Sequence, residues 1–415
     1  MEKQDFTRNR KQPFSATLLF MLNLLRRSLA IEIDSFVRHL NEKLFSGGIV
    51  QYFTSSAFIQ NRQKIKPEVF QYLSGVIIEN FYTTDNSSLQ LFKGFRVLAV
   101  DGSRITMPFT SALKKHYGVS KNQSQTEVVQ ARTSVLYDVL NNIALDAVLD
   151  NLSHGERELA LRHANQWKKG DLIIYDRGYP SYDFIYEHLR ENIDCLIRIK
   201  TTYNSMIKDF VTQGKKSILT KIYPNERKSF KDKDYDRTSS IEVRLLRIEL
   251  PGGEVEVLMT TLLDNRKHPS KMFKELYFLR WGIETFYDEL KNKLKVEHFT
   301  GYSETSIQQD FYCAIFISNL QSIIVNDLAD ELAIENERKQ FNYKVNTNLS
   351  YGFLKNRILE LLYKEAPLEH VFHELESLFL KNTVPIRKNR SNKRNVGKYR
   401  CRLKPKVTKN QKDAI

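Results

Sequence analysis

The order of elements between residues 95 and 199 constrains the fold of this chain more than any other feature of its sequence. Three apolar, strand-like runs come first, and a helix, a strand, a second helix and a last strand follow them. Three hairpin-linked strands followed by alternating helices and strands predict a mixed sheet with helices on its faces. The expected ranges are 95–100, 132–140, 143–149, 156–167, 172–175, 182–190 and 195–199.

Turn-forming residues separate several of these runs. Asn141-Asn142 joins the second and third runs and favours a tight hairpin. Asp101-Gly102-Ser103 follows the first run, and Asp176-Arg177-Gly178 follows the fourth strand. Both tripeptides favour a turn directly after a buried strand. The sequence therefore predicts that Asp101 and Asp176 stand where strands end.

A β-rich insertion interrupts the alternating order. Residues 201–265 separate the last strand from a long helix expected over 271–294. Within the insertion, two strand-like runs at 241–250 and 254–263 flank Pro251-Gly252-Gly253, which predicts a hairpin. Helical patterns lie on both sides of this core, and their expected ranges are 15–44, 67–82, 306–333 and 354–381.

A short helix is also expected after Thr54, with Ser55 or Ser56 as its N-cap. It would display polar and cationic side chains, which suit either a small helical DNA reader or a cationic face on a packing helix. The sequence leaves both interpretations open. The side chains in question are those of Gln60, Arg62, Lys64 and Lys66.

The positive charge of the chain is concentrated at its C-terminal end. The formal net charge is +15, but the first 380 residues carry 51 Lys and Arg against 48 Asp and Glu, a net of only +3. Residues 381–412 contain thirteen Lys or Arg and no acid. Such a tail would attract polyphosphate without reading sequence. The alternative is a solvated terminus that aids solubility.

Cysteine usage and hydropathy favour a cytoplasmic protein. Cys195, Cys313 and Cys401 lie too far apart for zinc-ligand spacing, and their odd count gives no disulfide framework. The apolar run 16–25 is only ten residues long and leads into Arg26-Arg27. We interpret this run as part of an amphipathic helix and expect no membrane association.

The helix expected over 271–294 carries a chemically distinctive stripe. On a helical wheel, Tyr277, Arg280, Glu284 and Lys291 fall within an arc of roughly 60°. The apolar residues 279, 283, 286, 290 and 294 form a separate arc of roughly 80° that faces a core. A carboxylate flanked by phosphate-binding cations suits metal-assisted chemistry on a nucleic-acid backbone.

Three acids are expected to converge at one edge of the sheet. Asp101 and Asp176 follow strands, where ligands gather in open sheets, and Glu284 projects from the helix that packs nearby. Carboxylate oxygens are the ligands of Mg²⁺ or Mn²⁺, and two such ions about 4 Å apart can act on both oxygens of an in-line displacement at phosphorus. Taken singly, each acid could instead be an ordinary turn residue or, for Glu284, the partner of Arg280.

These residues together resemble the insertion-sequence-four family of DDE transposases. The resemblance rests on Asp101, Asp176 and Glu284 together with the Y-R-E-K signature Tyr277-x2-Arg280-x3-Glu284-x6-Lys291. The surrounding blocks are similar as well, and they are Val100-Asp101-Gly102-Ser103, Tyr175-Asp176-Arg177-Gly178-Tyr179 and Arg280-Trp281-Gly282-Ile283-Glu284. The resemblance implies a ribonuclease H-like fold, and the β-rich insertion is typical of the family.

The resemblance also implies a function and a division of the chain. Asp101, Asp176 and Glu284 would bind two divalent ions, Mg²⁺ or Mn²⁺, while Tyr277, Arg280 and Lys291 would contact backbone phosphates. A homodimer would pair two ends of double-stranded DNA from a bacterial insertion sequence, close to the nucleoid. The expected regions are a helical DNA-binding region at 1–90, a catalytic domain at 91–200 with 266–305, the β-rich insertion at 201–265, a helical region at 306–384 and a basic tail at 385–415.

Two alternatives to transposition remain open at the level of sequence. One is a structure-specific nuclease on the same fold that never joins strands, and the other is an inactive protein that binds transposon ends. Two residues next to predicted site residues in the sequence are left out of the expected site. Trp281 is expected to pack rather than stack on a base, and Arg177 fits a surface turn as well as a phosphate contact.

Overall fold

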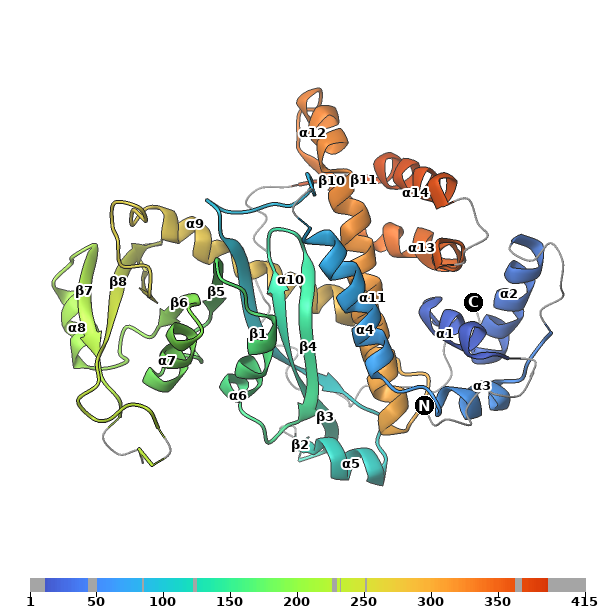
Figure 1. The fold of residues 1–415 in the computed structure, drawn as a ribbon, viewed down its shortest axis with the longest axis horizontal. Coiled ribbons are helices and arrows are strands. Elements are labelled where there is room, and N and C mark those ends of the chain that lie inside the picture. The colour runs from blue at the N-terminus through green and yellow to red at the C-terminus, as the bar shows by residue number, and fades with distance from the viewer. Residues whose placement is uncertain are drawn as a thin grey trace.

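The computed structural model describes residues 12–43, 51–83, 86–121, 125–225, 230–231, 233–250, 252–362 and 368–386. Within them, a single large sheet runs through the middle of the molecule, and the helices lie on its faces and beyond one end (Figure 1). Cys401 and the basic tail from Arg387 onward lie outside the described residues, so the expectations for them stay predictions.

Five strands build the core of the sheet in the predicted order. They are β1 (Arg96–Thr106), β3 (Glu127–Asp138), β4 (Ile143–Asn151), β5 (Asp171–Tyr175) and β6 (Asp194–Ile199). β1 is antiparallel to β3 and parallel to β5, which is parallel to β6, while β4 pairs with the other edge of β3. Three antiparallel strands followed by two parallel ones form the ribonuclease H-like arrangement, and the predicted fold class is confirmed.

The predicted hairpin between the second and third strands is present. Asn142 takes up a positive φ of 56° in the turn between β3 and β4, and it accepts a hydrogen bond from the Tyr137 hydroxyl at 3.3 Å. Asparagine tolerates this left-handed conformation better than most residues. The Asn141-Asn142 pair therefore sets the turn, as its composition indicates.

The turn expected at Asp101-Gly102-Ser103 is wrong. All three residues lie inside β1, which continues to Thr106. The reason is the antiparallel ladder to β3, which pairs β1 without interruption from Leu98↔Asp138 to Thr106↔Gln130. Backbone pairing on one edge keeps this segment extended although Asp-Gly alone favours a turn. Asp101 is thus a residue within a strand.

The insertion extends the central sheet. It contains α8 (Ser205–Thr212), β7 (Ser217–Ile222), β8 (Ile241–Glu249) and β9 (Val255–Thr260). β9 pairs antiparallel with β6, and β8 and β7 follow outward, which gives a nine-stranded sheet within the described residues. The predicted β8–β9 hairpin is confirmed, although its Pro251 lies outside the described residues. The insertion forms the left end of the molecule in Figure 1.

Helices cover both faces of the sheet. Apolar residues of α6 (Glu156–Leu161), α7 (Tyr182–Arg190) and α8 join one buried cluster with alternate residues of β1, including Leu98 and Val100. The intervening β1 residues Val97, Ala99 and Ile105 join a second cluster with the helices from α9 (Met272–Leu279) to α11 (Glu304–Asp327). The expected helix at 156–167 continues past α6 as a 3₁₀ turn over Arg162–Gln166.

The N-terminal region is helical, with two corrections to the expected boundaries. The single helix expected over 15–44 is two helices, α1 (Phe14–Leu22) and α2 (Leu29–Lys43), because Leu24 has a φ of 52° between them. The cap of α3 (Ser55–Arg62) is Thr54 rather than a serine, since its side chain accepts from Ala57 N at 3.2 Å. α4 (Glu68–Phe81) agrees with the expected 67–82.

Arg62 is buried, so it does not belong to a displayed cationic face. Its guanidinium donates to Gln309 Oε1 at 2.8 Å and Asp310 Oδ1 at 2.8 Å, and it also bonds the Thr300 hydroxyl. In return, Gln309 Nε2 donates to the carbonyls of Arg62 and Ile65. This residue therefore fastens α3 to α11 and has no exposed charge to offer DNA.

The C-terminal region is also divided more finely than expected. The helix predicted over 306–333 is α11 followed by α12 (Ala329–Glu337), and the one over 354–381 is the end of α13 (Thr347–Leu362) followed by α14 (Leu368–Lys381). Asn356, with a φ of 67°, kinks α13. Short strands β10 (Tyr343–Val345) and β11 (Thr383–Pro385) pair with each other, and α5 (Ser111–Tyr117) and β2 (Val119–Lys121) complete the elements.

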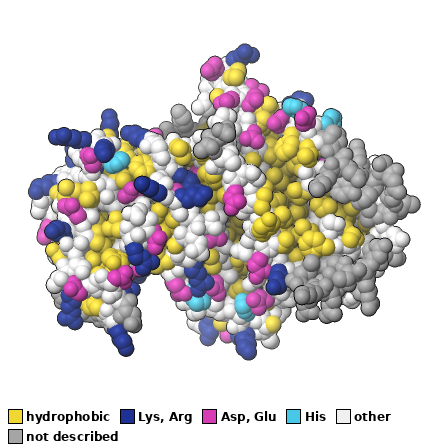
Figure 2. All heavy atoms as spheres, in the orientation of Figure 1, with side chains coloured by type: hydrophobic (Ala, Val, Ile, Leu, Met, Phe, Trp, Pro, Cys, Tyr) yellow, Lys and Arg dark blue, Asp and Glu magenta, His cyan; other side chains and the backbone are white. Residues whose placement is uncertain are grey.

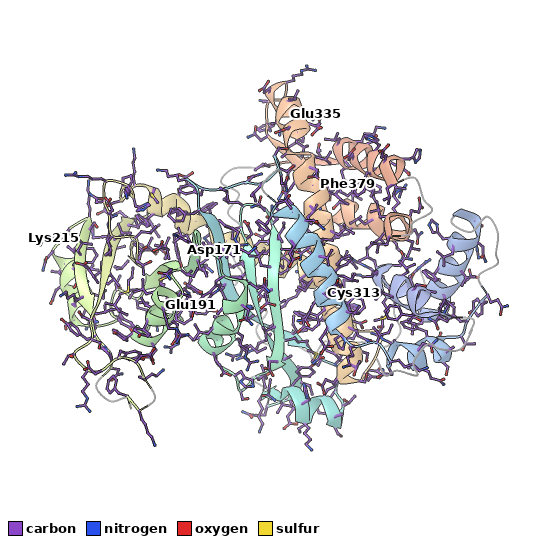
Figure 3. The ribbon with its side chains drawn as sticks, viewed as in Figure 1. Asp171, Glu191, Lys215, Cys313, Glu335 and Phe379 are labelled. Carbon is purple, nitrogen blue, oxygen red and sulfur yellow. The ribbon has the colours of Figure 1, made fainter. Side chains whose placement is uncertain are left out.

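The long helix α11 runs through the interior of the molecule. It packs against α4 and β4. The thiol of Cys313, which Figure 3 labels on this helix, donates to Met21 O of α1 at 3.2 Å. Within the described part of the chain no single helix is long and apolar enough to cross a membrane, while α11 and α12, bent by 50°, pass that test only as a pair by length and composition.

The surface in Figure 2 is divided by chemistry. A hydrophobic patch extends over α4 and the α13–α14 region in this view. Tyr72 of α4 is 71% exposed, and Phe372 of α14 is 37% exposed. Lys and Arg side chains are scattered over the insertion at the other end of the view.

Candidate active site

Asp101 and Asp176 lie level with each other on neighbouring parallel strands. The ladder between β1 and β5 ends at Ala99↔Ile174, and two residues further along each strand come Asp101 and Asp176. β5 stops at Tyr175, whereas β1 continues beside β3. Asp101 therefore lies on the strand at the level where its parallel neighbour ends, which keeps the two acids at one edge as expected.

Alternation places both acids on the sheet face that the Glu284 helix covers. Asp101 follows Val97 and Ala99 at spacings of two, and Asp176 follows Leu172 and Ile174 in the same way. All four apolar residues belong to the buried cluster that contains Ile283, Phe286 and Tyr287 of the helix. The carboxylates are thus directed toward the helix that carries Glu284.

That helix is present but is not one regular α-helix. α9 and α10 (Trp281–Asp288) are separated only by Arg280, and the π-helical turn η2 (Glu289–Lys293) follows α10. Glu284 lies in the first turn of α10. A π-turn changes the angular position of the residues after it, and such turns are common at functional sites. Lys291 lies within this π-turn, so its angular position differs from the one that a regular α-helix predicts.

Three side chains of the predicted stripe contact an acid or the strand that carries one, and the fourth, Glu284, is itself one of the acids. The Tyr277 hydroxyl donates to Asp176 Oδ1 at 3.2 Å. Arg280 donates to Glu284 Oε1 at 2.6 Å and lies 3.8 Å from Asp101 Oδ2. Lys291 Nζ donates to Ser103 Oγ at 2.6 Å. The structure thus brings all six residues predicted from the sequence to one site.

Two side chains of the stripe, Tyr277 and Arg280, are buried, whereas a stripe that contacts phosphate requires exposed side chains. Tyr277 and Arg280 are 6% and 4% exposed, while the carboxylate side chains of Asp101, Asp176 and Glu284 are 27–33% exposed. The phenol and the guanidinium therefore face the acids, and the acids face solvent.

Burial dominates the electrostatics of Asp101. It raises the pKa of Asp101 to about 6, and the Glu284 and Asp176 carboxylates act in the same direction. The Gly102 N–H, which donates to Asp101 Oδ1 at 2.8 Å, and the Arg280 charge oppose the shift. Burial also raises the pKa of Tyr277, so its hydroxyl keeps the proton that it donates to Asp176. Crowded acids of this kind favour a cation among them.

Arg198 belongs to the site in the structure but is not among the residues predicted from the sequence. The β5–β6 ladder ends at Tyr175↔Ile197, so Arg198 is level with Asp176 on the next strand. Its guanidinium lies 3.9 Å from Asp176 Oδ1 and 2.9 Å from Glu256 Oε1 of β9. The available signal is a charged residue inside the otherwise apolar run 195–199. Asp101, Asp176 and Arg198 therefore form a row across β1, β5 and β6.

The two residues left out of the predicted site have different positions. Trp281 is 48% exposed, so the expectation that it packs is wrong for about half of its surface. The Arg280 guanidinium lies 5.4 Å from its ring centroid. Arg177 is exposed, in agreement with a surface residue after β5.

The donor set suits a hard divalent cation. Three carboxylates and no softer ligand are present among the gathered side chains, and oxygen is what Mg²⁺ and Mn²⁺ prefer. In the described residues, however, the three carboxylates do not form a complete set of metal ligands. In the described ranges, no group of three or more His, Cys, Asp or Glu side chains is arranged to hold a metal ion.

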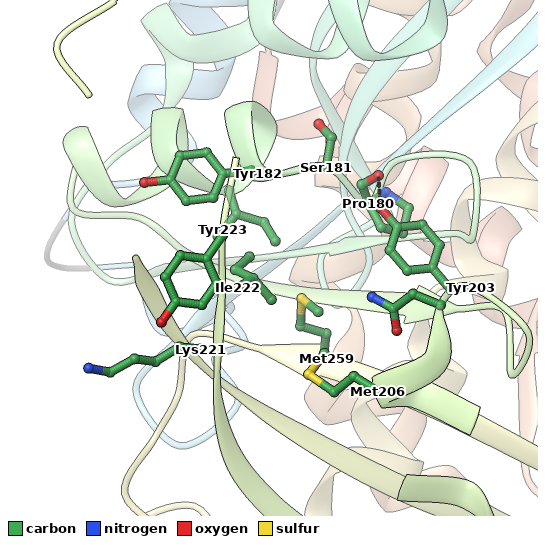
Figure 4. Close-up of a pocket in the computed structure, with 11 residues that line it drawn as sticks. Pro180, Ser181, Tyr182, Tyr203, Met206, Lys221, Ile222, Tyr223 and Met259 are labelled. Atoms are coloured by element: carbon green, nitrogen blue, oxygen red, sulfur yellow. Dashed lines mark hydrogen bonds between the residues drawn. The ribbon is translucent and has the colours of Figure 1, made fainter. Parts of the chain in front are cut away.

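A cavity of about 310 Å³ lies near this edge on the opposite face of the sheet. Its lining includes Ile185 and Met259, which belong to the cluster around α7 and α8. Figure 4 shows Tyr203 on one side and Tyr182 and Tyr223 on the other, with the Tyr203 hydroxyl donating to Pro180 O at 3.3 Å. The sheet separates this cavity from the acids.

A ribonuclease H-like sheet with acids gathered at the end of its parallel strands defines the class of DDE nucleases and transposases. The chain belongs to the transposases with a DDE domain, since the family model described as a transposase DDE domain matches residues 93–320, more than half of its length. The matched segment spans every core strand and reaches into α11. The chain is therefore an enzyme of the DDE type.

Comparison with individual proteins adds little to this assignment. No curated protein matches the chain. A cryo-EM structure of piggyBac transposase, described as a synaptic complex with hairpin DNA, is similar over 95% of this chain and 82% of that chain. The sequence identity is 11% and the TM-score is 0.44.

Proposed function

We propose that the chain is the transposase of a bacterial insertion sequence in the insertion-sequence-four family. It cleaves DNA at the element's ends with divalent metal ions, and it then transfers the freed 3′ hydroxyl to target DNA. The observation that carries this proposal is the level placement of Asp101 and Asp176 on adjacent parallel strands, with Glu284 on the helix above them.

Asp101, Asp176 and Glu284 hold the metal ions in this proposal. When bound, two ions of Mg²⁺ or Mn²⁺ supply an activated attacking oxygen and stabilise the leaving oxygen. The chain's own contribution is to orient the carboxylates. The Tyr277 hydroxyl fixes Asp176, and Arg280 fixes Glu284. No side chain has to act as a covalent nucleophile.

Tyr277, Arg280 and Lys291 contact backbone phosphates of the DNA end. A guanidinium can bind phosphate through two parallel hydrogen bonds, and an ammonium acts as a point charge. Because Arg280 and Tyr277 are buried against the acids, their contacts with phosphate have to form inside the site. Arg198 adds a further guanidinium beside Asp176, on the side of the site where the insertion lies.

The remaining regions have supporting roles. The helical region at 1–90 binds DNA through residues other than Arg62, and Gln60 and Lys66 are exposed there. The catalytic domain comprises 91–200 and 266–305, the insertion 201–265 lies beside the acids, and 306–384 holds the helical region that precedes the basic tail. Two copies of the chain pair two ends in a homodimer, in the cytoplasm near the nucleoid.

The test uses isosteric neutral variants of the three acids. Asp101→Asn, Asp176→Asn and Glu284→Gln should each abolish Mg²⁺-dependent cleavage of end DNA while the fold, checked by thermal unfolding, is retained. Exposed Asp288→Asn, on the same helix as Glu284, is the matched control and should cleave normally. Cleavage by any of the three variants at near the wild-type rate would refute the assignment.

A second assay separates transposition from simple nuclease action. Pre-cut end DNA with a 3′ hydroxyl is incubated with supercoiled target, and joined products are sought. Joined products support transposition, whereas cutting without joining would show that the chain is a nuclease. Binding of ends without metal-dependent turnover would show an inactive end-binding protein.

A further inference from the structure

The position of Arg280 suggests how metal binding at this site is controlled. We propose that the Arg280 guanidinium competes with the divalent cations for the oxygens of Asp101 and Glu284, and that DNA phosphate relieves this competition by pairing with Arg280. This inference rests on the proposed function of the acids. It makes Arg280 a residue that couples DNA binding to metal binding.

One guanidinium serves two of the three acids. It donates to Glu284 Oε1 at 2.6 Å, and its other terminal nitrogen lies 3.8 Å from Asp101 Oδ2. A divalent cation would need the same oxygens at roughly 2.0–2.6 Å. A positive charge already in contact with Glu284 repels a second one, so the two occupants exclude each other.

The arrangement of the acids agrees with this competition. Although Asp101, Asp176 and Glu284 share one site, they do not form a ready metal-binding group within the part of the chain that the structure describes. Glu284 faces Arg280, and Asp176 accepts from Tyr277. Metal binding therefore requires at least Glu284 to exchange its partner.

Arg280 also has a path toward a phosphate. Its Nε is buried and has no hydrogen-bond partner among the described residues, so the guanidinium has an unused donor. Its charged centre lies 5.7 Å from the ring centroid of Tyr277 and 5.4 Å from that of Trp281. Trp281 is 48% exposed, so movement along its face leads from the acids toward the surface.

A phosphodiester is the anion that suits this exchange. It offers the two acceptor oxygens that a guanidinium prefers, and it is the substrate group beside the acids in the proposed reaction. Pairing Arg280 with phosphate frees Glu284 and removes a positive charge from the metal site. The acids then bind the cations mainly when DNA is present.

The first experiment measures Mn²⁺ binding through the electron paramagnetic resonance signal of the free ion at pH 8. Arg280→Gln should bind Mn²⁺ about tenfold more tightly than the wild-type chain without DNA, because one positive charge is removed at close range. Arg280→Lys keeps the charge and should stay close to wild type. Lys274→Gln removes an exposed charge from α9 and should have no effect.

Unchanged or weaker Mn²⁺ binding by a folded Arg280→Gln chain would overturn the competition. Asp101→Asn separates this result from a failure of the proposed function. If Asp101→Asn abolishes Mn²⁺ binding while Arg280→Gln leaves it unchanged, the competition fails and the metal site stands. If Asp101→Asn binds Mn²⁺ as well as wild type, the metal assignment itself fails.

A second measurement does not depend on the stability of an Arg280 variant. Glu284→Gln releases Arg280 from its partner, so in the absence of metal it should bind an end-DNA duplex about fivefold more tightly than wild type. Glu289→Gln is the matched control, because it removes the acid of a similar pair, with Lys293 at 2.7 Å, on the same helix. Equal effects of the two substitutions would mean a general charge effect and would overturn the proposal.

Discussion

Lys291 Nζ donates a hydrogen bond to Ser103 Oγ at 2.6 Å, and this contact joins the π-helical turn to the strand that carries Asp101. Ser103 lies two residues beyond Asp101 on the same face of β1. The ammonium therefore lies beside the acids, where a phosphate would approach them. We expect Lys291→Gln to weaken end-DNA binding and to reduce the slope of log affinity against log salt by about 1.

Fluorescence anisotropy over a salt series measures this slope. Ser103→Ala is the control, since it removes the hydrogen-bond acceptor but keeps the charge of Lys291, and its slope should equal that of wild type. If Lys291→Gln also leaves the slope unchanged, Lys291 makes no phosphate contact.

The hydrogen bond from Tyr277 to Asp176 predicts a catalytic effect without a large change in stability. Tyr277→Phe keeps the buried ring but removes the donor to Asp176 Oδ1. Hydrogen bonds to charged groups contribute about 1.5–3 kcal/mol, so we expect the cleavage rate to fall about tenfold or more. Single-turnover cleavage of end DNA measures this rate. Tyr302→Phe, at an exposed tyrosine, should cleave normally, and a Tyr277→Phe rate equal to it would contradict the role of Tyr277.

The core of the fold could be predicted from sequence because its signals are local. Alternation and apolar runs mark the five core strands, and turn residues such as Asn142 mark their ends. The expected turn at Asp101 was wrong because pairing with β3, remote in sequence, outweighs the local preference of Asp-Gly. Strand pairing across long separations is not visible in composition.

The sequence predicted which residues lie together at this edge of the sheet, but not their contacts with one another. The 3–4–7 spacing identified Tyr277, Arg280, Glu284 and Lys291, and the structure places all of them beside Asp101 and Asp176. Which way Arg280 points depends on burial against the sheet, and the π-turn that contains Lys291 has no sequence signal that we recognise. Arg198 was missed because only the register of β6 brings it level with Asp176. The chemical roles of these residues stay predictions.

The burial of Arg62 predicts a loss of stability rather than a specific loss of DNA binding. Arg62→Met removes the cation from Asp310 and leaves Gln309 without one of its partners. Breaking a buried pair by removing one member costs about 3–5 kcal/mol, so we expect a clearly lower urea midpoint. Lys66→Gln, at an exposed cation after α3, should leave that midpoint unchanged. A stable Arg62→Met chain that no longer binds ends would restore Arg62 as a DNA contact.

Gly301 is a position where even a methyl group should be harmful. A Cβ built there would lie 2.5 Å from Ser306 Oγ and 2.8 Å from Ser306 Cβ. Ser306 cannot easily move, because its hydroxyl and backbone take part in the capping box of α11 with Ser303. We expect Gly301→Ala to destabilise the chain by about 1–3 kcal/mol, as overpacking does elsewhere. Gly252→Ala, where nothing lies within 4 Å, should be neutral in the same urea titration. Equal midpoints would mean that the α11 cap is able to shift.

His188 predicts that the chain loses stability in mild acid. The ring is buried; its Nδ1 donates to Phe184 O at 2.7 Å, and its Nε2 accepts from the Tyr175 hydroxyl at 2.7 Å, which is the neutral form. Burial lowers the pKa of His188 to about 4, below the 6.5 of an unfolded histidine. Between these values the unfolded chain binds more protons, so the contribution of His188 is complete above pH 6.5 and is lost as the pH falls toward 4.

The loss should amount to about 2 kcal/mol between pH 7.5 and pH 5. Urea unfolding at both values measures it, and His188→Phe, which cannot take up a proton, should reduce the difference by that amount. His373→Phe is the matched control, because this side chain is 82% exposed and its replacement should leave the pH dependence unchanged. If His188→Phe retains the full wild-type pH dependence, acid destabilisation comes from other groups, and the Tyr175–His188 contact tolerates a charged ring.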